Sequence, residues 1–171
     1  YLAVLAAFYA MRMPPMRRQP APRALLGELR DGLLYAYRFA PIKALLALTA
    51  LVSLVGIPYT VLMPVFAREI LHGGPLTLGF LMGASGLGAL VGALYLASRK
   101  TVVGLGKVIT LSTVLFGGSL IAFGMSRSLW TSLLLMLGVG FGMLVQMAAS
   151  NTILQTIVED DKRGRVMSFY A

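Results

Sequence analysis

Long stretches without a charged residue are the feature that most constrains this chain. Four of them, at about 44–67, 77–98, 108–126 and 129–157, are each close to or above the roughly 20 predominantly apolar residues that carry a helix across a bilayer. Only 12% of the residues are charged and 58% are hydrophobic, whereas soluble domains carry about 25% charged residues. The sequence therefore excludes a water-soluble enzyme and predicts four membrane-spanning helices.

Two shorter apolar stretches lie at the ends of the sequence. Residues 1–11 are too short to span a bilayer and are interpreted as the end of a helix, and a further helix is expected to start at 166. The expected fold is an all-α, polytopic helix bundle over 44–171, with four complete spans and a partial one at each end of the chain.

The basic residues predict the orientation of these spans. All 15 Lys and Arg residues except Arg68 and Arg127 fall in the segments 12–43, 99–107 and 159–165, which alternate with the spans so that they share one side. The positive-inside rule places that side in the cytoplasm of a multi-pass cell-membrane protein. The basic residues are dispersed over three loops, so no nucleic-acid partner is expected; the partner surface is the lipid bilayer.

The loop 12–43 has two parts. Four prolines make 13–23 an extended linker, since proline breaks helices. An amphipathic helix is predicted after it from apolar residues at helical spacing, and it either lies on the cytoplasmic membrane face or packs on the bundle. These residues are Leu25, Leu26, Leu29, Leu33 and Tyr37.

Small residues predict where the helices touch, because close approach replaces hydrophobic attraction between helices in lipid. The span 77–98 carries them on two stripes, one through Gly79 and Gly83 and one through Gly88. The fourth span adds Gly138 and Gly142.

Polar residues inside two spans are candidates for a substrate cavity. Thr49, Ser53 and Thr60 share one arc of the first span, which Pro58 is expected to kink or locally unwind. The same residues could instead bond their own helix, and the kink could be purely structural.

The fourth span carries the second group of cavity candidates: Gln146, Ser150 and Asn151. A glutamine at mid-bilayer depth needs a partner or water, so it either faces a cavity or makes an interhelical hydrogen bond.

Catalytic chemistry has no support in this sequence. None of the four predicted spans contains an acidic, basic or histidine residue, the chain has no Cys, and the single histidine, His72, lies in an outer turn. We therefore expect no enzyme activity, no cofactor and no metal site.

Several segments taken in order resemble the major facilitator superfamily of transporters, and most closely its drug and siderophore exporters of the enterobactin-exporter-like branch. The resemblance covers essentially the whole chain. It rests on 28–33 (ELRDGL), 83–90 (GASGLGAL), 151–156 (NTILQT) and 163–168 (RGRVMS).

This resemblance implies half of a twelve-helix fold that works by alternating access on a small-molecule substrate. The complete spans would be the seventh to tenth helices, 12–43 the central loop, and the N-terminal half would be the missing partner. The alternative function is a non-transporting membrane scaffold, or a membrane subunit that partners an ATPase.

The resemblance also implies a cytoplasmic motif between the second and third spans. Gly92, Arg99 and Lys100 fit it, but Ala97 and Ser98 stand where its acidic residue would be. A second short basic turn completes the predicted cytoplasmic gate: Asp160, Arg163, Gly164 and Arg165.

Overall fold

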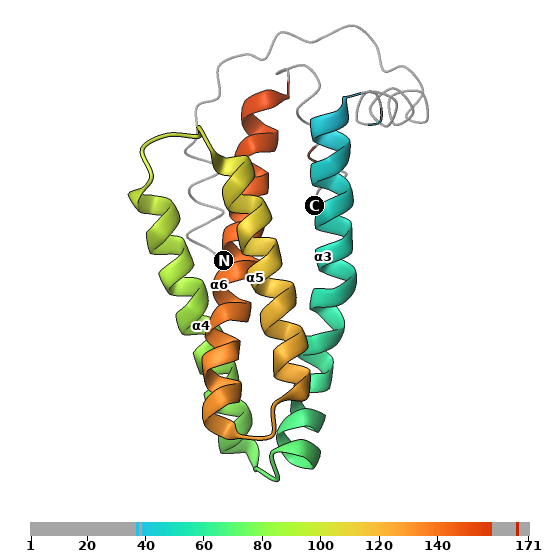
Figure 1. Cartoon of the computed structure of the whole chain (residues 1–171), viewed down its shortest axis with the longest axis vertical. Helices are drawn as coiled ribbons and strands as arrows, with labels where there is room; N and C mark the ends of the chain where they lie inside the picture. The colour runs from blue at the N-terminus through green and yellow to red at the C-terminus, as the bar shows by residue number, and fades with distance from the viewer. Residues whose placement is uncertain (1–36, 38, 159–166, 168–171) are drawn as a thin grey trace, which may run out of the picture.

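Four long helices and one short π-helix make up the described part of the computed structural model, which comprises residues 37, 39–158 and 167 (Figure 1). No strand occurs among these residues, which confirms the all-α fold. The predicted helix end at 1–11, the amphipathic helix before Tyr37 and the helix start at 166 fall outside the described residues. The elements are α3 (Ala40–Val65), η1 (Phe66–Ile70), α4 (Pro75–Ser98), α5 (Leu105–Met125) and α6 (Leu129–Ile157).

Helix α6 covers the expected range 129–157, but the other helices begin before their expected starts. Helix α3 begins at Ala40 rather than 44, and α4 begins at Pro75 rather than 77. Both carry a proline in their first turn, where its fixed φ suits a helix and its missing N–H leaves no bond unmade. Lys43 and Lys107 lie inside the first turns of α3 and α5, so the charges do not mark the helix ends.

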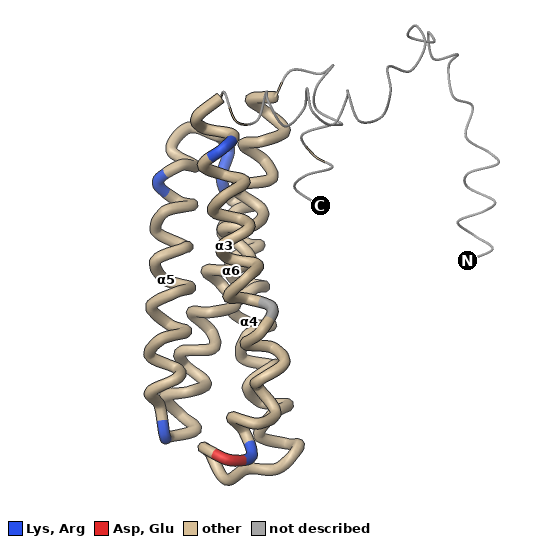
Figure 2. The backbone as a smooth tube through the Cα atoms, turned by 90° about the vertical axis from the view of Figure 1, so that its right-hand side faces the viewer, with Lys and Arg blue, Asp and Glu red and all other residues tan. Residues whose placement is uncertain are grey.

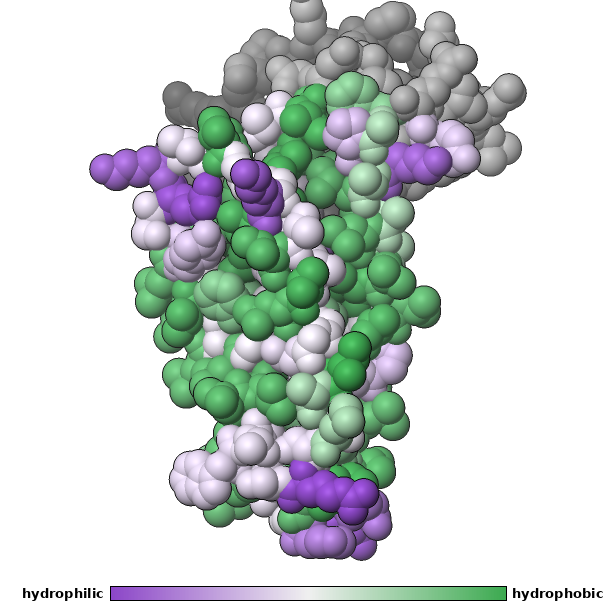
Figure 3. Space-filling model, viewed as in Figure 1, coloured by the Kyte–Doolittle hydropathy of each residue, from purple (hydrophilic) through white to green (hydrophobic). Residues whose placement is uncertain are grey.

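The four helices run alternately up and down, and their charged residues gather at the two ends (Figure 2). We call the end with Lys43, Arg99, Lys100 and Lys107 the basic end, and the end with Arg68, Glu69 and Arg127 the far end. An apolar band covers the visible face between the two ends (Figure 3). All four helices are long and apolar enough to cross a membrane.

Helix α6 is the most buried of the four and packs extensively against both α4 and α5. Its contact with α4 joins backbone to backbone. A methyl group on Gly140 would collide with the Ser85 carbonyl, and one on Gly88 would collide with the Leu137 carbonyl, so only glycine fits at either position. These two crossings fix the α4–α6 distance, because the backbone cannot yield as a flexible side chain can.

The α5–α6 contact uses glycines on a different face of α6. A methyl group on Gly142 would lie 2.6 Å from the Ser112 carbonyl oxygen and 2.8 Å from the Phe116 nitrogen. One on Gly138 would collide with the Ser119 hydroxyl. Helix α6 therefore lies tightly between its two neighbours.

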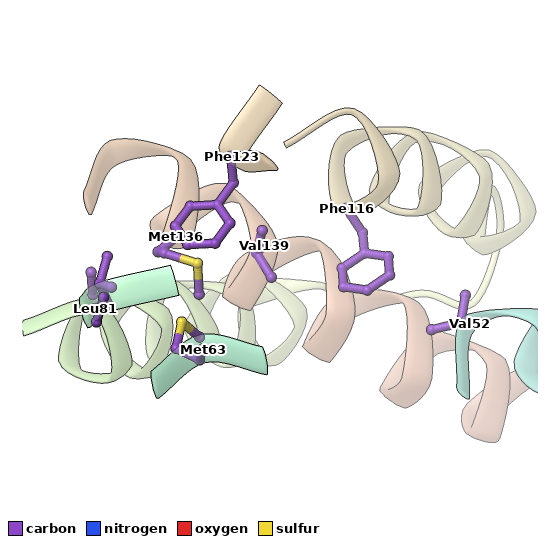
Figure 4. Close-up of a cluster of buried hydrophobic side chains, with 9 residues drawn as sticks. Val52, Met63, Leu81, Phe116, Phe123, Met136 and Val139 are labelled. Atoms are coloured by element: carbon purple, nitrogen blue, oxygen red, sulfur yellow. The ribbon is translucent and has the colours of Figure 1, made fainter. Parts of the chain in front are cut away.

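Helix α3 closes the bundle through side chains rather than backbone. Val52 and Met63 of α3 join a buried apolar cluster with Phe116 and Phe123 of α5 and Met136 of α6 (Figure 4). Two further clusters lie on the same helices toward the basic end. One is centred on Ile42, Leu154 and Val158, and the other on Leu105, Ile109 and Ala149.

Gly140→Ala tests the backbone contact between α4 and α6. The added methyl group meets the Ser85 carbonyl, so we expect the chain to lose about 1–3 kcal/mol of unfolding free energy in detergent micelles. Gly118→Ala on α5 is the matched control, because nothing lies within 4 Å of its Cβ position. That control should be neutral or slightly stabilising, since alanine favours a helix over glycine. Equal stability of the two variants would contradict the close crossing.

Candidate functional site

A layer of buried polar side chains lies inside the bundle between apolar clusters. On α3, Thr49 stands between Leu48 of the cluster nearer the basic end and Val52 of the large cluster. Ser112 on α5 and Gln146 on α6 occupy the corresponding places on their own helices. We call Thr49, Ser112, Gln146 and Ser150 the polar layer; all four are buried, and Gln146 and Ser150 have no exposed surface.

Gln146 satisfies only one end of its amide. Its Nε2 donates to the Ser150 hydroxyl one turn further along α6, at 3.3 Å. Its Oε1 is buried and accepts no hydrogen bond. A buried carbonyl oxygen without a partner costs free energy, and the described part of the chain supplies no donor for this one.

Thr49 presents a second unpartnered group to the interior. Its Oγ1 is buried and makes no hydrogen bond, whereas Ser112 donates to the Ile109 carbonyl of its own helix at 3.0 Å. The polar layer thus offers one hydroxyl and one amide oxygen that are free to bind. It carries no charge, so it suits uncharged hydrogen-bonding groups.

The remaining cavity candidates lie nearer the surface. Ser53 is half-buried and Thr60 is exposed, although the helical arc groups them with Thr49. Asn151 is half-buried and its Oδ1 accepts a hydrogen bond from Gln155 Nε2 at 3.0 Å. The structure therefore joins Gln146 to Ser150 by a hydrogen bond and buries Thr49 as well, whereas Ser53, Thr60 and Asn151 are only half-buried or exposed.

Pro58 does not unwind α3. The α-helix continues through it, and the regular pattern changes only after Pro64, where the π-helix η1 begins. Gly56 faces the Met143 and Phe116 side chains, and a methyl group added to it would lie 3.7 Å from each, at ordinary van der Waals distance. The proline thus lies beside a side-chain contact that can separate more easily than the glycine crossings of α6.

Arg99 is the best-anchored residue of the predicted cytoplasmic motif. Its guanidinium donates to the Tyr95 hydroxyl at 3.1 Å and to the Val103 carbonyl at 3.0 Å, while its Nε is buried without a partner. Gly92 packs against α6, with its Cβ position 3.2 Å from the Phe141 carbonyl oxygen. Lys100 is exposed. The other four gate candidates, at 160 and 163–165, lie outside the described residues.

The two glycine stripes of α4 have different surroundings. Gly88 and Gly92 face α6, whereas Gly79 and Gly83 meet nothing within 4 Å in the described part of the chain. They line instead an exposed apolar groove of about 710 Å³ between α4 and α6. That another helix packs on this second glycine stripe stays a prediction.

Two residues of these sites were missed by the sequence reasoning. Tyr95 is one helical turn before Arg99, so the i to i+4 spacing of an aromatic hydroxyl and an arginine was a usable signal. Ser112 had no such signal. Helix α5 contains a second buried serine, Ser119, and nothing in the sequence distinguishes the two. Among the described residues no group of His, Cys, Asp and Glu could hold a metal ion.

Comparison with known proteins gives one match. The sequence profile of a family described as transmembrane secretion effector matches residues 1–171. No curated protein and no solved structure matches the chain.

Two substitutions separate the made and unmade bonds of Gln146. Ser150→Ala removes the acceptor of Nε2 and should lower the unfolding free energy by about 0.6–2 kcal/mol. Gln146→Met keeps the size of the side chain and removes the unpartnered oxygen together with the Nε2 bond to Ser150, so the lost bond is offset and we expect a smaller loss than for Ser150→Ala. Unfolding in detergent micelles measures both. A larger loss for Gln146→Met than for Ser150→Ala would show that Oε1 is partnered in the folded chain.

Proposed function

The chain belongs to the transmembrane secretion effectors, a transporter family of the major facilitator superfamily, and we propose that it forms the C-terminal half of an exporter. In this proposal the exporter moves small molecules such as drugs or siderophores out of the cell by alternating access, and the polar layer is part of its substrate path. The branch of enterobactin-exporter-like proteins is the proposed relationship within the superfamily.

The single observation that carries the substrate site is the buried, unpartnered carbonyl oxygen of Gln146. A fold-stabilising hydrogen bond would leave both ends of the amide satisfied, yet only Nε2 has a partner. A substrate hydroxyl or amide N–H supplies the missing donor. Thr49 on the opposite helix supplies a donor hydroxyl for a substrate carbonyl.

Access to this layer requires two helices to separate, and α3 is the one proposed to move. It packs on the bundle through side chains, whereas α4 and α5 are locked to α6 by backbone contacts. The π-helix that follows Pro64 loosens the far end of α3, because π segments interrupt the regular hydrogen-bond ladder. Displacement of α3 would open the polar layer while α4, α5 and α6 stay together.

Export also requires an orientation, and we propose that the basic end lies in the cytoplasm. The support is the alternation of charge: the described cations at the basic end are Lys43, Arg99, Lys100 and Lys107, against Arg68 and Arg127 at the far end.

Gln146→Met tests the substrate site in a transporter that contains this chain together with its other half. We expect the transport rate to fall about two- to tenfold, which corresponds to one lost hydrogen bond, with unchanged protein abundance. Gln155→Met is the matched control, because Gln155 lies on the same helix and is exposed. Parallel losses of transport and abundance in Gln146→Met would assign the residue to packing instead.

Single cysteines test the orientation, since the native chain has none. Gly74→Cys at the far end should react with a membrane-impermeant thiol reagent added to intact cells. Val102→Cys at the basic end should react only after the cells are opened. Both positions are exposed in the structure, so a difference reports the side of the membrane. The reverse pattern would contradict the proposed direction of export.

A further inference from the structure

A pocket of about 590 Å³ opens at the basic end, where α4 ends and the α4–α5 loop begins. Its polar lining consists of Arg99, Lys100, Thr101 and Thr152, and its apolar lining includes Leu96 and Ala148. The volume is within the usual range of small-molecule sites. A pocket with cations on one side and aliphatic groups on the other suits an amphiphile.

The guanidinium group of Arg99 is held in one orientation by hydrogen bonds within the chain. Two of its donors are fixed, one on Tyr95 and one on Val103, and the Tyr95 ring lies with its centroid 6.0 Å from the guanidinium carbon. The Nε–H is buried and makes no hydrogen bond. A guanidinium that is already oriented loses little conformational entropy when an anion binds to its remaining donors.

The described part of the chain offers this arginine no carboxylate. Glu69 is the one acidic residue in that part, and it lies at the far end, 3.8 Å from Arg68. Along α4, which joins the two ends, the rise is roughly 36 Å, so Glu69 is beyond the Debye length of about 8 Å.

The depth of the pocket identifies the source of the anion. Helix α4 is longer than the roughly 30 Å hydrocarbon core of a bilayer, and Arg99 follows its last residue. Arg99 and Lys100 therefore stand at the level of the lipid headgroups, with the apolar wall of the pocket toward the acyl chains. Basic pockets between membrane helices are known sites for anionic headgroups.

We propose that this pocket binds the phosphodiester headgroup of one anionic membrane lipid, with the remaining Nη N–H groups of Arg99 and with Lys100 Nζ as its donors. The lipid phosphate is a counter-charge for Arg99 and Lys100, and its glycerol and upper acyl carbons cover Leu96 and Ala148. This proposal does not depend on the transport proposal, because it concerns the surface of the bundle and not the polar layer.

Native mass spectrometry of the 171-residue chain tests the site, with the chain released from vesicles of equal phosphatidylglycerol and phosphatidylcholine. We expect one retained phosphatidylglycerol. Lys100→Gln changes an exposed side chain, so it should fold normally and weaken retention; Arg99→Gln should weaken it about tenfold. Arg127→Gln at the far end, with the same change in charge, is the matched control and should retain the lipid.

Three outcomes would overturn the proposal. The first is equal retention of the two lipids by the native chain, and the second is equal retention of phosphatidylglycerol by Lys100→Gln and Arg127→Gln. The third is displacement of the lipid by millimolar inorganic phosphate, which would make the pocket a site for soluble phosphate. Circular dichroism of each variant confirms that a loss of lipid is not a loss of fold.

Discussion

The close contact of α6 with both neighbours is the constraint on which the rest of the structure depends. Helices in lipid gain nothing from hydrophobic attraction to one another, so they associate through close packing. Gly140 and Gly88 let α4 and α6 meet backbone to backbone, and Gly138 and Gly142 let α5 approach another face of α6. Gln146 and Ser150 continue the i+4 stripe of Gly138 and Gly142 along α6, and both are fully buried. The position of the polar layer is thus a consequence of the glycine pattern.

The polar layer costs free energy, because it buries polar atoms that make no hydrogen bond. A four-helix bundle in lipid needs no buried glutamine, and aliphatic residues above and below the layer show what packing requires there: Val139 and Ala149 on α6 are fully or almost fully buried. Gln146 keeps one unpartnered oxygen and Thr49 one unpartnered hydroxyl in the same interior. These two unmade bonds are what the proposed substrate path rests on, because a layer satisfied by its own chain would have no donor or acceptor left to offer.

The sequence predicts the fold class and the four spans because the bilayer imposes a length and a polarity that can be counted. It predicts the helix starts less well, since Lys43 and Lys107 sit within first turns and extend their charges outward along long side chains. The i to i+4 spacing also places Ser150 beside Gln146, and the structure has them hydrogen-bonded. The spacing of residues along one helix does not predict which neighbouring helix a stripe of small or polar residues contacts. On α4, Gly79 and Gly88 lie on stripes that the sequence does not distinguish, yet of these two only Gly88 meets α6. On α3, Thr49 and Thr60 share an arc, yet of these two only Thr49 is buried. Burial there depends on how α3 lies across α6.

The α4–α5 loop departs from the resembled family pattern in a way that changes its chemistry. Ala97 and Ser98 stand where the pattern has an acid, and Arg99 bonds instead to a tyrosine hydroxyl and a main-chain carbonyl. Both acceptors are neutral and lie within four residues of the arginine, so the guanidinium keeps its full charge while its position is fixed by its own helix and loop. An arginine paired with a carboxylate would be neutralised within the chain and would change partners when that carboxylate changed its charge. Arg99, by contrast, is held by neutral partners, so its charge is left for an anion that the described part of the chain does not place beside it.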